Sequence, residues 1–171
     1  MPITIPEDIN FDSDGKFISC LKIPYSTNTS GWGSLMMPLI VIRNGKGKTI
    51  LFTGGNHGDE YEGPIALRKL ANELMQEDIQ GQVIIVPYLN FPAVLSGRRL
   101  SPVDGLNMNR SFPGDPQGSI TLMIDGLLVI DLAVSKVARG KILKASQNNE
   151  NIPIGWALDK EGNNTDRPED A

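Results

Sequence analysis

The chain has 171 residues, of which 40% are hydrophobic, 21% charged and 6% aromatic, which is the length of one ordinary domain with a sizeable core. The net charge of -4 argues against a nucleic-acid binder of the usual electrostatic kind, and the single cysteine, Cys20, excludes an internal disulfide. The apolar runs fall far short of the roughly 20 residues of a membrane span, and the N-terminus lacks a basic segment followed by an apolar one. We therefore expect a cytoplasmic protein that binds neither nucleic acid nor membrane.

The first half of the chain predicts an α/β arrangement. Strands are expected at 16–24, 34–43 and 48–53, with a turn at 44–47, and Pro38 predicts that the second strand is an edge or bulged strand. Apolar residues at helical spacing over 63–76 are followed by a buried strand at 82–87. Strand, glycine-rich turn, helix and strand form a βαβ crossover, so the sheet should be partly parallel.

The second half is less regular. Residues 88–118 predict a long connection, a helix should follow Ser119, and 133–145 has a helical pattern. From about 147 the composition is polar, and we expect a poorly ordered, extended tail. Trp32 and Trp156 are expected to be packing anchors, and Met36 and Met37 to fill the core.

His57 and Glu60 are the sharpest candidate pair for chemistry. They lie three residues apart where a strand turns into a helix, so one helical turn places both on the same side. An imidazole and a carboxylate suit Zn²⁺, whose catalytic sites use three protein ligands and one water. The alternative is an exposed histidine beside acidic residues that the start of a helix favours.

A second group of candidates lies in the long connection and consists of Arg98, Arg99, Asn109 and Arg110. An arginine binds a carboxylate through two parallel hydrogen bonds, and near a metal it could stabilise a developing oxyanion. The alternative is a set of solvated arginines that pair with Asp104 or Asp115.

Three motifs carry a resemblance to a known family: Gly-Gly-Asn-His-Gly-Asp-Glu-Tyr-Glu-Gly-Pro at 54–64, Asn-Phe-Pro-Ala at 90–93, and Arg-Leu-Ser-Pro-Val-Asp-Gly-Leu-Asn-Met-Asn-Arg-Ser-Phe-Pro-Gly at 99–114. Residues 9–123 resemble the succinylglutamate desuccinylase/aspartoacylase family, in particular its N-acetyl-diaminobutyrate deacetylases of ectoine breakdown. The resemblance implies the N-terminal part of a zinc-carboxypeptidase-like α/β/α sandwich with a mixed sheet. It also implies a zinc-dependent hydrolase that cleaves the amide bond of a small N-acyl amino acid such as N-acetyl-diaminobutyrate.

The same resemblance implies roles for individual residues. His57 and Glu60 would be zinc ligands, Arg99 would face the scissile carbonyl, and Asn109 and Arg110 would hold a substrate carboxylate. The family's third ligand, a histidine, and its glutamate base have no counterpart here, since His57 is the one histidine of the sequence. The missing ligand would have to come from a second copy of the chain, or from Asp104 or Asp131.

Residues 127–165 resemble a stretch of the malate/L-lactate dehydrogenase family, which implies that Ser135 and Lys141 inherit contacts near a nicotinamide cofactor. The simplest account is a chimaera. A truncated deacylase-like catalytic domain at 1–123 is then joined to a dehydrogenase-like fragment at 124–171, which forms a helix and an extended tail. Two other functions stay open: a fragment of an NAD(P)-dependent oxidoreductase, and a non-catalytic domain that binds acyl-amino acids through Arg99 and Arg110. The sequence does not indicate an oligomeric state.

Overall fold

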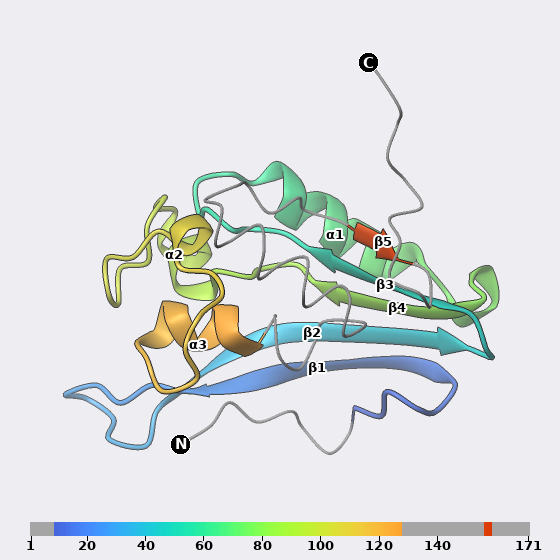
Figure 1. Cartoon of the computed structure of the whole chain (residues 1–171), viewed down its shortest axis with the longest axis horizontal. Coiled ribbons are helices and arrows are strands. Elements are labelled where there is room, and N and C mark those ends of the chain that lie inside the picture. The colour runs from blue at the N-terminus through green and yellow to red at the C-terminus, as the bar shows by residue number, and fades with distance from the viewer. Residues whose placement is uncertain (1–8, 128–155, 159–171) are drawn as a thin grey trace.

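The computed structural model of the chain describes residues 9–127 and the short strand at 156–158, and within these residues a mixed sheet forms the centre of the fold (Figure 1). The sheet has the order β1-β2-β4-β3-β5. Its strands β1 and β2 pair antiparallel, as do β2 and β4, whereas β3 and β4 pair parallel and β5 adds antiparallel to β3. The strand bounds are β1 Gly15–Pro24, β2 Ser34–Asn44, β3 Lys48–Thr53, β4 Gly81–Val86 and β5 Trp156–Leu158.

The predicted βαβ crossover is confirmed. Helix α1 (Glu62–Glu73) connects the parallel strands β3 and β4, with a 3-10 turn, η1 (Gln76–Asp78), before β4. The helix ends earlier than predicted because Leu74 adopts an extended conformation, and Nζ of Lys16 donates a hydrogen bond to its carbonyl oxygen at 2.8 Å. The turn at 44–47 is also confirmed, but the strands that it joins do not pair, because β4 lies between them.

The expectation that Pro38 marks an edge strand is wrong for β2 as a whole, since β2 lies inside the sheet. Pro38 faces Cys20 of β1, whereas the pairing of β2 with β4 begins only at Ile40. The proline therefore lies in the part of β2 that has a neighbour on one side only. Its missing N–H costs no hydrogen bond to β4 there.

The connection at 88–118 is more structured than predicted. It contains helix α2 (Phe91–Ser96) and a 3-10 turn, η2 (Met108–Arg110). The side chain of Asn90 caps the start of α2 by accepting from the N–H of Ala93, and Gly97 ends it in the left-handed conformation at φ 60°. Local capping thus stabilises a helix too short to show a hydrophobic period. The helix expected after Ser119 is confirmed as α3 (Ile120–Leu127).

Two apolar clusters pack on opposite faces of the sheet. In β2, Leu39 and Val41 pack with α3 on one face, whereas Ile40 and Ile42 pack beneath α1 on the other. This alternation follows from the two-residue period of a strand. Helix, sheet and helix form three layers, which confirms the mixed α/β sheet and the layered fold expected from the resemblance.

Two packing predictions are wrong. Trp32 is 90% exposed, because it lies in the loop that connects β1 and β2 beyond the paired residues, and Met36 is exposed whereas Met37 is buried. The helix expected at 133–145 and most of the expected tail lie outside the described residues, as do Asp131, Ser135 and Lys141.

None of the helices in the described part of the chain is long and apolar enough to cross a membrane.

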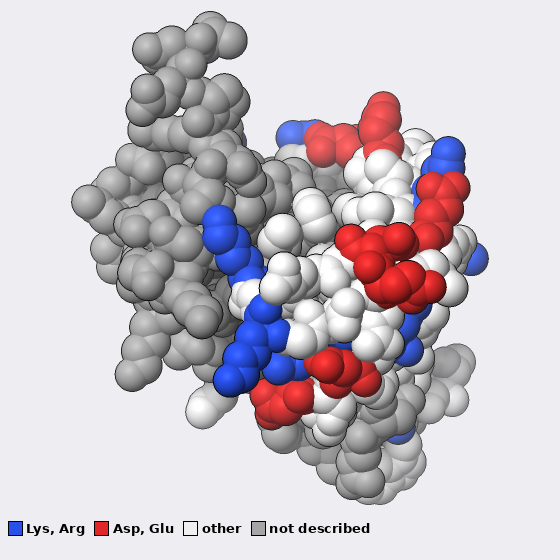
Figure 2. Space-filling view, turned by 90° about the vertical axis from the view of Figure 1, so that its right-hand side faces the viewer, with Lys and Arg blue, Asp and Glu red and all other residues white. Residues whose placement is uncertain are grey.

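The end of the molecule at which β2 ends and β3 and β4 begin carries both positively and negatively charged side chains (Figure 2).

Candidate active site

The segment that follows β3 is held at the carboxyl end of the parallel strand pair. The N–H of Gly54 donates to the carbonyl oxygen of Val86, and the N–H groups of Leu89 and Asn90 donate to Gly54 and Gly55. Gly55 turns the chain at a φ of 70°, a conformation that favours glycine. His57 therefore lies at the edge of the sheet where ligand sites of α/β folds are commonly found.

Gly58 brings this segment against α2. Its N–H donates to the carbonyl oxygen of Arg98 at 3.0 Å, and a Cβ atom at Gly58 would lie 2.1 Å from the carbonyl carbon and oxygen of Ala93. Only a glycine permits so close an approach of two backbones. The consequence is that Arg99 lies beside Glu60, although 39 residues separate them in the sequence.

His57 is buried and both of its ring nitrogens have partners. Nε2 lies 3.1 Å from Oδ1 of Asn107, and Nδ1 lies 2.9 Å from Oε1 of Glu60. Because Oδ1 of Asn107 also accepts from the N–H of Asn109, it is an acceptor, so Nε2 carries the proton. In the neutral ring Nδ1 then presents a lone pair to a carboxylate oxygen. Nδ1 of His57 and Oε1 of Glu60 would then be two acceptors 2.9 Å apart, which repel each other unless a cation lies between them. This cation is either a proton or a metal ion.

Glu60 provides a carboxylate in the form that metals bind. Nη1 of Arg99 donates to its Oε1 at 2.9 Å, and both side chains are about half exposed. Burial by itself would raise the pKa of Glu60, but the hydrogen bond from Arg99, together with the one from His57 when a proton lies between Nδ1 and Oε1, outweighs it and holds that pKa below its usual value. The chemistry of this donor set, a neutral imidazole nitrogen and an ionised carboxylate, fits Zn²⁺.

Asn109 and Arg110 lie on η2, and the residue just before η2, Asn107, contacts His57. The structure thus connects both predicted groups of site residues through Asn107. Sequence reasoning missed the role of this residue, although it stands two positions before Asn109 in the motif Asn-Met-Asn-Arg, which is the signal that could have identified it.

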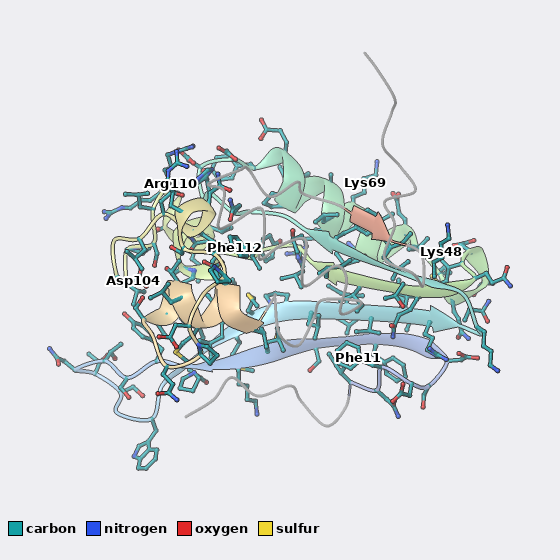
Figure 3. The ribbon with its side chains drawn as sticks, viewed as in Figure 1. Phe11, Lys48, Lys69, Asp104, Arg110 and Phe112 are labelled. Carbon is teal, nitrogen blue, oxygen red and sulfur yellow. The ribbon has the colours of Figure 1, made fainter. Side chains whose placement is uncertain are left out.

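The alternative in which the loop arginines pair with Asp104 or Asp115 is wrong for the described residues. Asp104 accepts hydrogen bonds from the N–H and Oγ1 of Thr121, both at 2.8 Å, and so caps α3. Arg110 lies away from it, near the top of the loops around α2 (Figure 3). Within residues 9–127, no three His, Cys, Asp or Glu side chains cluster as metal ligands, so Asp104 does not complete the His57–Glu60 pair.

Asp125 is a second polar residue that sequence reasoning missed. It is fully buried in α3, and neither carboxyl oxygen has a hydrogen-bond partner. Burial, together with the nearby charge of Asp104, raises the pKa of Asp125 to about 9. The side chain is therefore a neutral acid at pH 7.

Comparison with known proteins relates this geometry to a family. Residues 46–127 match the succinylglutamate desuccinylase/aspartoacylase catalytic domain, and residues 124–171 match the malate/L-lactate dehydrogenase family. The chain is 55% identical over 120 residues to the N-alpha-acetyl-L-2,4-diaminobutyric acid deacetylase of Halomonas elongata, covering 70% of this chain and 35% of that protein. It is 59% identical over 44 residues to the (2R)-3-sulfolactate dehydrogenase (NADP(+)) of Chromohalobacter salexigens, which covers 26% of this chain and 13% of that protein.

Solved structures agree with the first match. The product-bound ectoine utilization protein EutE (DoeB) from Ruegeria pomeroyi superposes with a TM-score of 0.74 at 52% identity, over 77% of this chain and 40% of that one. The succinylglutamate desuccinylase/aspartoacylase from Rhodobacter sphaeroides superposes with a TM-score of 0.75 at 47% identity, over 79% of this chain and 42% of that one. The chain thus spans well under half the length of these relatives. Residues 46–127 are thus similar in sequence to the succinylglutamate desuccinylase/aspartoacylase catalytic domain, and the fold is similar to solved structures that carry that name.

Proposed function

We propose that the chain carries part of a zinc-dependent deacylase that hydrolyses the amide bond of an N-acyl amino acid such as N-acetyl-diaminobutyrate. The observation that carries the proposal is the 2.9 Å approach of Nδ1 of His57 to Oε1 of Glu60. The identity to a diaminobutyrate deacetylase supports the same substrate class. On this proposal residues 1–123 form the deacylase-like part of a cytoplasmic protein, and 124–171 the dehydrogenase-like part.

Each site residue then has a role that its position supports. His57 and Glu60 would hold zinc, which when bound polarises a carbonyl and lowers the pKa of a bound water. Asn107 holds the His57 ring by accepting from Nε2. Arg99 is fixed through one nitrogen by Glu60, so its remaining N–H groups are available for the substrate carbonyl oxygen. Asn109 and Arg110 would bind the substrate carboxylate.

The site is incomplete within the residues that the structure describes. A catalytic zinc site uses three protein ligands, and His57 and Glu60 supply two. With two ligands the chain would bind zinc weakly and turn over substrate slowly or not at all. A third ligand from a second copy or from residues outside the described ranges would restore zinc binding, and turnover would also need a general base.

The first experiment measures zinc per chain in the purified 171-residue protein. His57→Ala is the test variant, and Lys46→Ala, in the exposed turn at 44–47, is the matched control. In zinc-supplemented buffer we expect zinc in the parent and in the control but not in His57→Ala, and release of acetate from N-acetyl-diaminobutyrate only if a further ligand completes the site. If His57→Ala retains the zinc of the parent, or if the folded parent holds none in zinc-supplemented buffer, the zinc proposal is wrong for this chain.

Two other functions are separated by ligand titrations. The 59% identity to a sulfolactate dehydrogenase favours testing NADPH, although those 44 residues are 13% of that protein. We expect no change in NADPH fluorescence on addition of the chain, and saturable binding would instead support an oxidoreductase fragment. A non-catalytic acyl-amino-acid binder would bind N-acetyl-diaminobutyrate in the presence of EDTA and lose it in Arg99→Gln and Arg110→Gln.

A further inference from the structure

A second concave surface lies between α1 and α2, apart from the residues proposed for the deacylase site. It has a volume of about 760 Å³, and its walls include Tyr61, Ile65, Arg68, Tyr88, Phe91 and Leu95. Three of the large apolar side chains in its walls are unusually exposed: Tyr61 is 51% exposed, Ile65 67% and Leu95 68%. Exposed apolar side chains gathered in one groove mark a binding surface more often than single exposed ones do.

The groove also carries an unbalanced positive charge. Nη1 of Arg68 donates to the hydroxyl of Tyr88 at 3.3 Å, and among the described residues no carboxylate pairs with this guanidinium. The neighbouring Lys69 lies 3.9 Å from Glu73, so its charge is largely balanced. One free guanidinium beside an apolar wall is complementary to one carboxylate attached to an apolar body.

We propose that this groove binds a small amphipathic carboxylate, with its apolar body against Ile65, Phe91 and Leu95 and its carboxylate on Arg68. The volume lies in the range of small-molecule pockets, and a single unpaired cation matches a single negative charge. Tyr88 and Phe91, whose ring centres lie 6.4 Å apart, both line the groove, and the hydroxyl of Tyr88 contacts the guanidinium. None of these residues takes part in the proposed zinc site, so the inference does not rest on the deacylase proposal.

Octanoate is a suitable probe because it has one carboxylate and a flexible apolar chain. Its binding to the full 171-residue chain, treated with EDTA, can be followed by the amide NMR signals of α1 and α2. We expect saturable shifts in residues 61–73 and 91–96, with a dissociation constant on the order of 1 mM for so small a ligand. Octan-1-ol, which lacks the charge, should bind about tenfold more weakly.

Two variants test the two parts of the groove. Arg68→Gln should weaken octanoate binding about tenfold and leave octan-1-ol unaffected, whereas Lys46→Gln removes a distant positive charge and should change neither. Ile65→Glu places a negative charge at an exposed position of the wall and should abolish octanoate binding without unfolding the chain. Amide spectra of both variants check that each is folded.

Three results would overturn the proposal. They are equal octanoate affinity in the parent and in Arg68→Gln, equal affinity of the parent for octanoate and octan-1-ol, and octanoate shifts that lie outside α1 and α2. Shifts of the α1 signals with protein concentration alone, in the absence of octanoate, would also contradict it, because they would assign the groove to a second copy of the chain.

Discussion

Nε2 of His57 lies 3.1 Å from Oδ1 of Asn107, fifty residues further along the chain. The amide oxygen accepts at the same time from the N–H of Asn109, which fixes its orientation. The contact determines which nitrogen of the ring carries the proton, and therefore which one faces Glu60. A residue that is not one of the two proposed zinc ligands thus orients the ring of His57.

Replacing Asn107 should weaken zinc binding without removing a ligand. We expect Asn107→Ala to lower zinc affinity about 10- to 100-fold, because the His57 ring loses the partner that orients it. Asn107→Asp keeps an acceptor at the same place and should stay close to the parent. Competition with a chromophoric chelator measures the affinity. Parent-like affinity in Asn107→Ala, beside a loss in His57→Ala, would show that the contact does not orient the ring.

Gly58 should tolerate no side chain. A methyl group there would collide with the backbone of Ala93 at 2.1 Å, and neither backbone segment can move without disturbing β3 or α2. We expect Gly58→Ala to lower the free energy of unfolding by about 3 kcal/mol or more. Gly31→Ala is the matched control, since nothing lies within 4 Å of the added atom. Urea unfolding compares the two, and equal midpoints would contradict the close approach.

Asp125 should make the stability of the chain fall as the pH rises. Its pKa is about 9 in the folded state against 3.8 as the ordinary value, so between these limits the folded state holds a proton that the unfolded state has released. The free energy of unfolding then decreases by about 1.4 kcal/mol for each pH unit in that range, for this group alone.

Asp125→Asn isolates this effect because the amide does not titrate. The difference in stability between the variant and the parent, measured by urea unfolding from pH 5 to pH 8, should grow in favour of the variant as the pH rises. A difference that stays constant across this range would mean that Asp125 is not buried as a neutral acid.

Asp104 should show the opposite dependence on pH. Burial alone would raise its pKa, but hydrogen bonds from Thr121 and Leu106 help to hold that pKa below its usual value. The stabilisation is present above the ordinary pKa of 3.8 and is lost as the pH falls through the lower folded value. We expect Asp104→Ala to cost about 1 kcal/mol at pH 7, because α3 loses its cap.

Thermal unfolding of Asp104→Ala, with Asp12→Ala as an exposed control, checks this expectation. The deficit of Asp104→Ala should diminish as the pH falls below 3.8 and through the lower pKa of the folded state, because the parent carboxyl is then also protonated. A deficit no larger than that of the control at pH 7 would show that the cap contributes nothing.

Hydrophobic periodicity determined much of the fold, because α1, α3 and the strands β1 to β4 each show their burial pattern within a short stretch of sequence. The candidate pair His57 and Glu60 could also be predicted, since a spacing of three is a local relationship. The exposure of Trp32 could not be predicted, because the type of a residue does not reveal whether its loop folds back onto the core.

Only the tertiary structure decided that β4 lies between β2 and β3, that Arg99 meets Glu60, and that Asn107 orients His57. Each of these contacts joins residues that are distant in the sequence, and no local pattern records which distant segment will pack there. The burial of Asp125 without a partner was hidden for the same reason, since it follows from the packing of α3 and the loop before it. The helices, the strands and the candidate metal-binding pair could be predicted because they depend on residues close together in the sequence. The site around that pair depends on backbone contacts such as that of Gly58 with Ala93, which exist only in the folded chain.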